Sequence, residues 1–326
     1  SLCSVLPDTA DSLSAKEFIS ESLPVLITKQ FSKEGIHLEH SSSYHLFAVK
    51  LFENLKKLNL FPLELFSAVE LAKKNAKWFF QPDGNTNLLG DSALKNIRQF
   101  RNLHPELLYL SDNSGGKRPE EHIGYFPESG YSFFRNYWST SDLKRTSYLA
   151  FSATYHSSVH KQRDDLSFTW FDCGKPIITD SGKFSYGDSA KASFFRSRFA
   201  HNTVAIDAED HLFPSKPYGS GIKHAEKIGN YYWTNGSVYR MKSGTTHQRH
   251  LLLLPNKWLV VIDSLYSERE HKYQQLFHFA EDFNVIKSKK KIWAESSKTK
   301  LFIQHVSTNP TESEIIRGQT KPSIQG

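Results

Sequence analysis

The sequence predicts an α+β protein, in which a helical first third is followed by an antiparallel β-sandwich. Apolar residues of the first 100 or so positions recur at helical spacing, whereas from about residue 122 short apolar runs alternate with Gly, Pro, Asn and Ser turns. The helix-like and strand-like patterns do not alternate along the chain, which argues against a parallel α/β sheet. A length of 326 residues favours two domains, 1–112 and 113–326, with the linker SDNSGGKRPEE at 111–121.

Three longer helices and one short helix are expected before the linker. Ser14 and Glu17 form a capping box for a helix that extends to about residue 30. The second helix starts at 41–43 and runs to about Leu58, the third follows Pro62 and reaches about residue 80, and the short one covers 93–100. One apolar stripe on the second helix contains Tyr44, Phe47, Ala48, Leu51, Leu55 and Leu58.

The rest of the chain is expected to form strands that pair as an antiparallel sandwich. Asn256, between LLLL and WLVVI, is expected at the centre of a hairpin turn, and Lys287 to Lys291 on a solvated strand flank or hairpin. The predicted strands are 124–127, 132–137, 147–156, 166–172, 176–180, 201–207, 230–241, 247–254, 257–264, 272–279 and 299–306.

The net charge of +7 favours an acidic partner, which could be nucleic acid, anionic lipid or an acidic polysaccharide. The basic residues are dispersed, so nucleic acid is the weakest of these. No apolar run reaches the roughly 18 residues of a membrane span. Cys3 and Cys173 are too few for a disulfide framework or a cysteine metal site. Both ends look cut from a longer protein; a periplasmic or extracellular location is favoured, and the oligomeric state stays open.

Two polar segments are candidate sites. The first, EGIHLEHSSSYHLF, carries His37 and Glu39 before the second helix and Tyr44 and His45 in its first turn, where the helix dipole raises the positive potential. The alternative for Tyr44 is an ordinary core position in the apolar stripe. The second segment, 159–207, is expected to form three neighbouring strands that gather polar side chains for an acidic ligand; ordinary surface polarity is an equal alternative. These side chains are His160, Asp165, Asp180, Tyr186, Arg196, Arg198 and His201.

Arg196 and Arg198 would share a face of an extended segment and could clamp a carboxylate, or else pair with Asp164, Asp165 or Asp188. His160, Asp180 and His201 are residue types of zinc sites, although their spacing is long. The sequence has no GxGxxG, GxxxxGK[ST], GxSxG or HExxH motif, so it lacks the usual signatures of nucleotide binding and of serine or zincin hydrolysis.

Several ordered motifs together resemble the heparinase II/III-like family of heparin, heparan sulfate and alginate lyases. They are EGIHLEHSSSYH, the loop with PDG and GDS at 82–92, FPESGY at 126–131, HKQRDDLSF, DSG and AHNTV. The resemblance covers most of the chain. It implies a partial (α/α) toroid followed by a β-sandwich, and β-elimination at uronic acids in an acidic polysaccharide or oligosaccharide.

The resemblance also implies roles for individual residues. Tyr44 matches the catalytic tyrosine and His160 the assisting histidine. Tyr186 loosely matches a tyrosine that contacts substrate, and His37 and Glu39 fall on the motif that shapes the site, so all three are candidates for substrate contacts. Arg196 and Arg198 are the remaining candidates for substrate contacts.

The chain departs from the family pattern at two places. The zinc ligands of some members correspond to Gln162, Asp180 and His201, and glutamine is a poor zinc ligand, so a hydrogen-bonded cluster is the alternative to bound Zn²⁺. The residue that neutralises the uronate carboxylate is expected upstream of residue 1, which leaves open whether the chain alone is active.

The prediction is therefore a polysaccharide lyase that leaves a 4,5-unsaturated uronate. The main rival is a non-catalytic protein with the same fold, which binds glycans or serves exopolysaccharide biosynthesis. A glycosidase is a third option, but it needs two carboxylates that flank the scissile bond, and the motif residues here are tyrosine and histidine.

Overall fold

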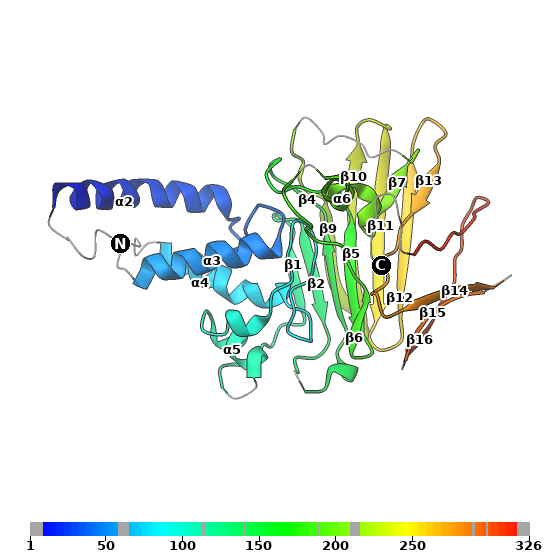
Figure 1. Ribbon diagram of the computed structural model, residues 1–326, viewed down its shortest axis with the longest axis horizontal. Coiled ribbons are helices and arrows are strands. Elements are labelled where there is room, and N and C mark those ends of the chain that lie inside the picture. The colour runs from blue at the N-terminus through cyan, green and yellow to red at the C-terminus, as the bar shows by residue number, and fades with distance from the viewer. Residues whose placement is uncertain are drawn as a thin grey trace.

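The computed structural model describes residues 9–57, 65–112, 115–139, 141–187, 189–208, 216–288, 291–297 and 299–317. A helical region packs on one side of a stack of β-sheets (Figure 1). The predicted α+β class, with helices first and antiparallel sheets afterwards, is confirmed. The toroid and the division at residue 112 stay predictions, and Cys3, Leu58, Pro62 and Asp188 lie outside the described residues.

The helices follow the predicted order, with two corrections. The first helix begins before Ser14, because the Thr9 side chain accepts a hydrogen bond from the Ser12 backbone N–H at 3.3 Å and caps it there. A helix that begins at Pro105 was not predicted, although proline is favoured in a first turn. The helices are α2 (Ala10–Gln30), α3 (Ser42–Lys57), α4 (Phe66–Asn75) and α5 (Pro105–Asp112), and the 3₁₀ turns among them are η2 (Ala76–Phe79) and η3 (Ile97–Gln99).

Two antiparallel sheets form the sandwich. The first has the order β1 (Ile123–Phe126), β2 (Tyr131–Arg135), β3 (Tyr148–Ser152), β5 (Ser167–Asp172) and β6 (Lys175–Ile178). The second has the order β12 (Trp258–Tyr266), β11 (Thr245–Leu254), β10 (Tyr231–Arg240) and β9 (Ile222–Ile228). Asn256 lies between β11 and β12 with φ 60°, which confirms the predicted hairpin turn.

Smaller strand groups complete the structure. They are β7 (Val204–Ile206) with β13 (Tyr273–Gln275), β4 (Thr154–Tyr155) with β8 (Gly219–Ser220), and the sheet of β14 (Asn284–Ser288), β15 (Lys291–Ser296) and β16 (Thr299–Ile303). Lys287 pairs with Ile292 in the β14 and β15 hairpin, in line with the alternative given for that lysine cluster. Strands β8, β9, β14 and β15 were not predicted.

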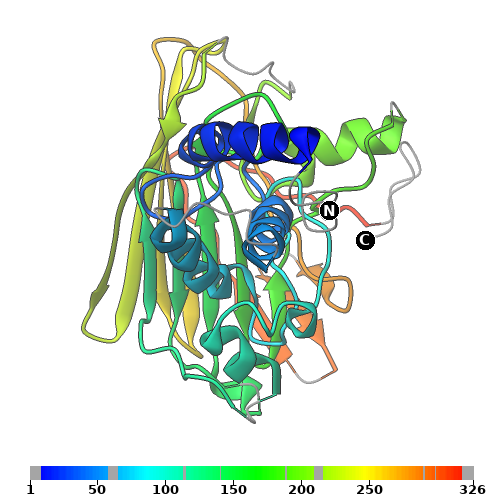
Figure 2. The ribbon, with the colours of Figure 1, turned by 90° about the vertical axis from the view of Figure 1, so that its left-hand side faces the viewer.

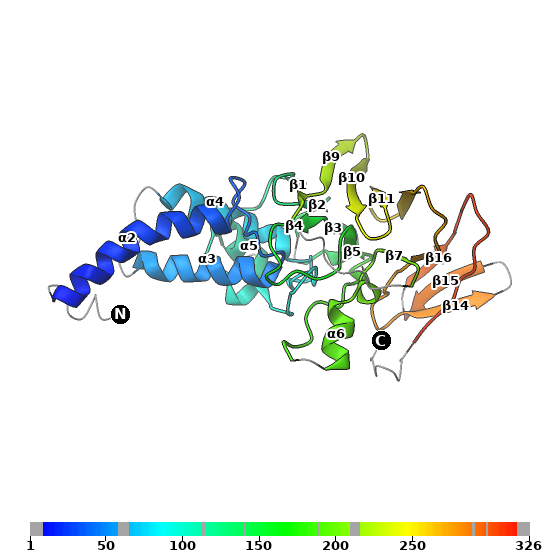
Figure 3. The ribbon, with the colours of Figure 1, turned by 90° about the horizontal axis from the view of Figure 1, so that it is seen from above.

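Two apolar cores lie on opposite faces of the five-stranded sheet. Along β3, Leu149 and Phe151 point into the core shared with the four-stranded sheet, whereas Tyr148 and Ala150 point into the core shared with the helices. Every residue of β3 is therefore buried. Figures 2 and 3 show the resulting layers, with α2, α3 and α4 on one side of the sheets and β14 to β16 at the far side.

None of the helices in the described ranges combines the length and the apolar character that a membrane crossing needs.

We expect the protein to lose stability as the pH falls from about 6.5 to about 4. Burial is the largest cause that lowers the pKa of His37 to about 3, of His40 to about 2, and of His45 and His247 to about 4. The unfolded chain therefore binds more protons in this range, so each histidine costs on the order of 1 kcal/mol per pH unit. Urea unfolding at several pH values measures this loss. An unfolding midpoint that stays constant from pH 7 to 4.5 contradicts it.

Candidate active site

The start of α3 is fixed by hydrogen bonds to the loop that carries Asp91. The Ser41 hydroxyl donates to the Asp91 backbone oxygen at 2.7 Å, and the Ser42 backbone N–H donates to the Ser92 hydroxyl at 3.1 Å. The preceding Gly90 has φ +65°, and a Cβ atom there would lie 2.0 Å from the His40 backbone oxygen. Only glycine fits this contact, so the loop holds Asp91 beside the first turn of α3, where Tyr44 lies.

Tyr44 and His160, the two predicted catalytic residues, lie in contact. Their rings stack with centroids 3.7 Å apart and an angle of 16° between the planes. His160 is in a turn with φ 54°, and its Nδ1 lies 3.0 Å from the Glu39 carboxylate. A residue from the helical region and one from the sandwich thus form a single site, with Glu39 oriented toward the histidine.

Tyr186 completes this group of aromatic side chains. Its hydroxyl is hydrogen-bonded to that of Tyr44, donates to Asp91 Oδ2 at 2.9 Å and accepts from Lys183 Nζ at 3.0 Å. The Tyr186 ring centroid lies 6.0 Å from that of His160. Sequence reasoning did not select Asp91 or Lys183, although Asp91 belongs to the quoted GDS motif.

Burial and the hydrogen bond to Tyr186 raise the pKa of the Tyr44 hydroxyl well above its usual value near 10, and the Lys183 charge only partly opposes this. The Tyr44 hydroxyl is therefore protonated at neutral pH. It can donate a proton, but it is a poor base in this arrangement.

His37 supports the site from within the core. Its backbone N–H donates to His45 Nδ1 at 3.3 Å, and its ring packs edge-on against Phe31 with centroids 5.0 Å apart. The His37 side chain is buried, so it does not line an open surface beside Tyr44. Burial leaves the His37 side chain no surface for a direct substrate contact. Its role in shaping the site stays a prediction.

The segment 159–207 forms the predicted strands β5, β6 and β7, but β7 pairs with β13 rather than with β5 or β6, and the predicted polar side chains lie outside all three strands. Arg196 is the last residue of α6 (Ala190–Arg196), and Arg198 opens the 3₁₀ turn η5 (Arg198–Ala200). The prediction that they share a face of an extended segment was wrong. Arg198 is buried, and its charge contributes to the low pKa of Asp165. The other predicted residues lie in turns and loops outside the helices and strands; they are His160, Asp165, Asp180, Tyr186 and His201.

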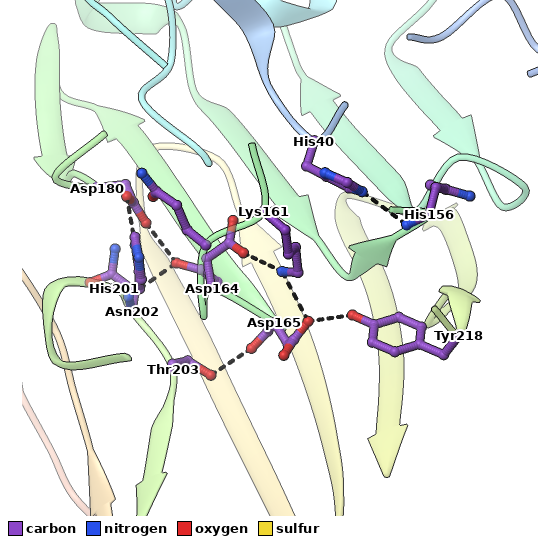
Figure 4. A network of polar contacts seen from close by, with 12 residues as sticks. His40, His156, Lys161, Asp164, Asp165, Asp180, His201, Asn202, Thr203 and Tyr218 are labelled. Carbon is purple, nitrogen blue, oxygen red and sulfur yellow. Dashed lines mark hydrogen bonds and ion pairs between the residues drawn. The ribbon is translucent and has the colours of Figure 1, made fainter. Parts of the chain in front are cut away.

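Two of the predicted zinc ligands, Asp180 and His201, are bonded to each other (Figure 4). His201 Nδ1 lies 2.9 Å from Asp180 Oδ1, both side chains are fully buried, and the Ser167 hydroxyl donates to Asp180 Oδ2 at 2.9 Å. Gln162 donates to the Gly182 backbone oxygen at 3.1 Å. Burial lowers the pKa of His201, but the Asp180 carboxylate outweighs it and raises the pKa overall.

This arrangement does not fit a zinc site. Asp180 Oδ1 is bonded to His201 Nδ1, and the third candidate, Gln162, is an amide that binds zinc poorly beside imidazole and donates to the Gly182 backbone oxygen. Within the described residues, no three His, Cys, Asp or Glu side chains are placed to hold a metal ion. We therefore assign no zinc-dependent step.

A second buried network fixes the turn that carries His160. Lys161 Nζ lies 3.1 Å from Asp165 Oδ1 and also pairs with Asp164. Arg240 and the Tyr218 hydroxyl bind the Asp165 carboxylate as well, as Figure 4 shows for Tyr218. Burial alone would raise the pKa of Asp165, but the charges of Lys161 and Arg240 bring it well below its usual range.

The helices pack on an antiparallel sandwich, and Tyr44 and His160 are in contact where the two meet. The chain belongs to the Heparinase II/III-like, C-terminal family, whose model matches residues 118–324. Tyr44 lies outside that match and His160 within it.

Individual relatives agree with this assignment. The chain is 26% identical over 287 residues to the heparin-sulfate lyase of Pedobacter heparinus, with 81% of this chain and 42% of the relative covered. It is similar to the crystal structure of heparan sulfate lyase HepC from Pedobacter heparinus, with a TM-score of 0.79, 22% identity, and coverage of 94% and 51%. A heparinase III gene product gives a TM-score of 0.76, 20% identity, and coverage of 89% and 48%. The chain thus spans about half the length of these relatives.

Proposed function

We propose that the protein cleaves a uronic-acid-containing glycan by β-elimination and leaves a 4,5-unsaturated uronate. The observation that carries the proposal is the contact of Tyr44 with His160, whose rings stack at 3.7 Å. An acid and a base are thereby close enough to act on neighbouring atoms of one sugar ring. The lyases among the relatives support the same reaction class.

The geometry favours different roles for the two residues. A carboxylate only accepts hydrogen bonds, so Glu39 places the proton of a neutral His160 ring on Nδ1 and leaves Nε2 as the acceptor. His160 Nε2 would take the C5 proton. The Tyr44 hydroxyl, whose raised pKa keeps it protonated, would give its proton to the departing O4.

An assay of the full-length protein tests the proposal. Alginate, heparan sulfate, hyaluronan and bacterial exopolysaccharides are incubated with the protein, and the ultraviolet absorbance of unsaturated uronate is followed. Absorbance that grows with time on one of these glycans supports the lyase. Binding without product on all of them would show a glycan-binding protein instead, and new reducing ends without absorbance would show hydrolysis.

Glu39→Gln is expected to lower kcat on that glycan by about tenfold or more, because the amide can donate to His160 Nδ1 and so favour the wrong tautomer. KM should change little, since Glu39 faces the histidine. The absorbance assay measures both constants. Glu128→Gln is a matched control, because Glu128 has no side-chain bond to the site within the described residues. Equal kcat for Glu39→Gln and the unmodified protein would exclude this role.

A further inference from the structure

Two charged side chains that the proposed reaction does not use converge on the Tyr186 hydroxyl. Asp91 Oδ2 accepts from it at 2.9 Å, and Lys183 Nζ donates to it at 3.0 Å. The Lys183 ammonium also lies 4.2 Å from the centroid of the Tyr186 ring. We call Tyr186, Asp91 and Lys183 the Tyr186 cluster.

The backbone holds the two loops of this cluster together. The Lys183 backbone N–H donates to the Ser92 oxygen at 2.8 Å, next to Asp91. At Gly182, which has φ +60°, a Cβ atom would lie 2.5 Å from that same Ser92 oxygen. Glycine is required for this approach. The two charged groups are therefore positioned by backbone contacts as well as by their own side chains.

The hydrogen-bonding capacity of each group fixes the direction of the bonds. A carboxylate only accepts and an ammonium only donates, whereas a phenol donates once and accepts twice. The Tyr186 O–H therefore points to Asp91, and its oxygen receives Lys183 and the remaining partner, the Tyr44 O–H. In the resting arrangement, Lys183 and Tyr44 therefore both donate to the Tyr186 oxygen, while the Tyr186 proton lies toward Asp91.

We propose that Lys183 resupplies, through Tyr186, the proton that Tyr44 gives to the leaving sugar, and that Asp91 holds the Tyr186 hydroxyl between Lys183 and Tyr44 in the resting state. The inference rests on the proposed function. Once the Tyr44 proton is on O4 and the C4–O4 bond is broken, the Tyr44 oxygen has become an acceptor. The Tyr186 O–H then turns from Asp91 to the Tyr44 oxygen and transfers its proton. Tyr186 takes one proton from Lys183, and Lys183 regains one from solvent. His160 releases the C5 proton to solvent, so protons balance over the cycle.

Other ionisable groups near the cluster, among the residues that the structure describes, include Glu39, His160 and Lys95. Glu39 faces His160, and its charge contributes to the raised pKa of Tyr186. The Lys183 charge contributes to the lowered pKa of Lys95, so the two ammonium groups are close enough to repel each other. Lys95 makes no side-chain hydrogen bond to Tyr186 within the described residues. It is therefore a suitable comparison, because it adds positive charge without being part of the hydrogen-bond chain.

Lys183→Ala in the full-length protein tests the relay. Stopped-flow absorbance of unsaturated uronate separates the first turnover from later ones. We expect an unchanged first turnover and a steady-state rate lower by about tenfold or more, since proton transfer by a positioned group contributes at least this much. Added methylammonium should restore the rate. Lys183→Met, which fills the same space, should show the loss without restoration. Equal slowing of the first turnover, or no restoration of the alanine variant, overturns the relay.

Lys95→Ala separates proton transfer from simple attraction of an anionic glycan. Its steady-state rate is expected to stay near that of the unmodified protein and to be insensitive to methylammonium. A loss as large as that of Lys183→Ala would mean that positive charge alone matters, and the relay would be wrong. An unmodified protein that forms no unsaturated product refutes the proposed function itself, whereas an active protein with a fully active Lys183→Ala variant refutes only the relay.

Discussion

Replacing Tyr44 by phenylalanine is expected to lower kcat by about 10²- to 10⁴-fold, the usual contribution of a general acid. The substitution removes only the hydroxyl, so the ring can still stack on His160. Substrate binding should be largely retained, because in the proposed reaction the lost group acts on the departing O4 in the transition state. The rate of unsaturated uronate formation measures the effect, and circular dichroism verifies the fold.

Tyr239→Phe is the matched control for this experiment. Tyr239 lies on β10 and is 56% exposed, and removal of its hydroxyl is expected to leave kcat unchanged. A Tyr44→Phe variant that keeps more than about a tenth of the original kcat would show that another group protonates the leaving oxygen.

Replacing Arg249 by leucine is expected to lower the free energy of unfolding by about 3–5 kcal/mol, the usual cost of removing one partner of a buried ion pair. Arg249 is fully buried and binds both oxygens of Asp263, at 2.7 and 2.8 Å. It also donates to the Leu166 backbone oxygen at 2.8 Å and to that of Asn202. Leucine leaves the Asp263 carboxylate with His247 and Gln275 as partners.

Urea unfolding at pH 7 measures this loss. Arg101→Leu is the control, because Arg101 is exposed in a loop and its replacement should stay within about 0.5 kcal/mol of the original stability. If Arg249→Leu unfolds at the same urea concentration as Arg101→Leu, the buried ion pair does not contribute to stability as described.

The sequence predicted those parts of the fold that depend on local pattern. The stripe that includes Tyr44 and the serines before it predicted α3 nearly to the residue. Strand β9 was not predicted, because only Ile222 of that strand is buried and its other residues form no apolar run. An edge strand of this kind is stabilised by its neighbour, and its own residues carry little signal.

The sequence motifs predicted those residues of the candidate site that belong to a motif, but not those that join it only through tertiary contacts. The motifs led to the prediction that Tyr44 and His160 face one site, and in the structure their rings are in contact. Asp91 and Lys183 meet Tyr186 only through contacts between distant loops, which no spacing reveals. Arg196 was misplaced because FFRSRF alternates like a strand, whereas the Ser189 side chain accepts from the Ala192 backbone N–H at 3.1 Å and starts a helix.

The left-handed backbone of His160, with φ 54°, has an evolutionary consequence. The left-handed conformation has a lower conformational free energy for glycine or asparagine than for histidine. For glycine the difference is roughly 1 kcal/mol. Random drift would therefore favour those two residues in any lineage that no longer needs an imidazole there. We therefore expect related proteins that use this imidazole in catalysis to keep a histidine at this position. A related protein with glycine or asparagine there is expected to have the same fold without the proposed activity.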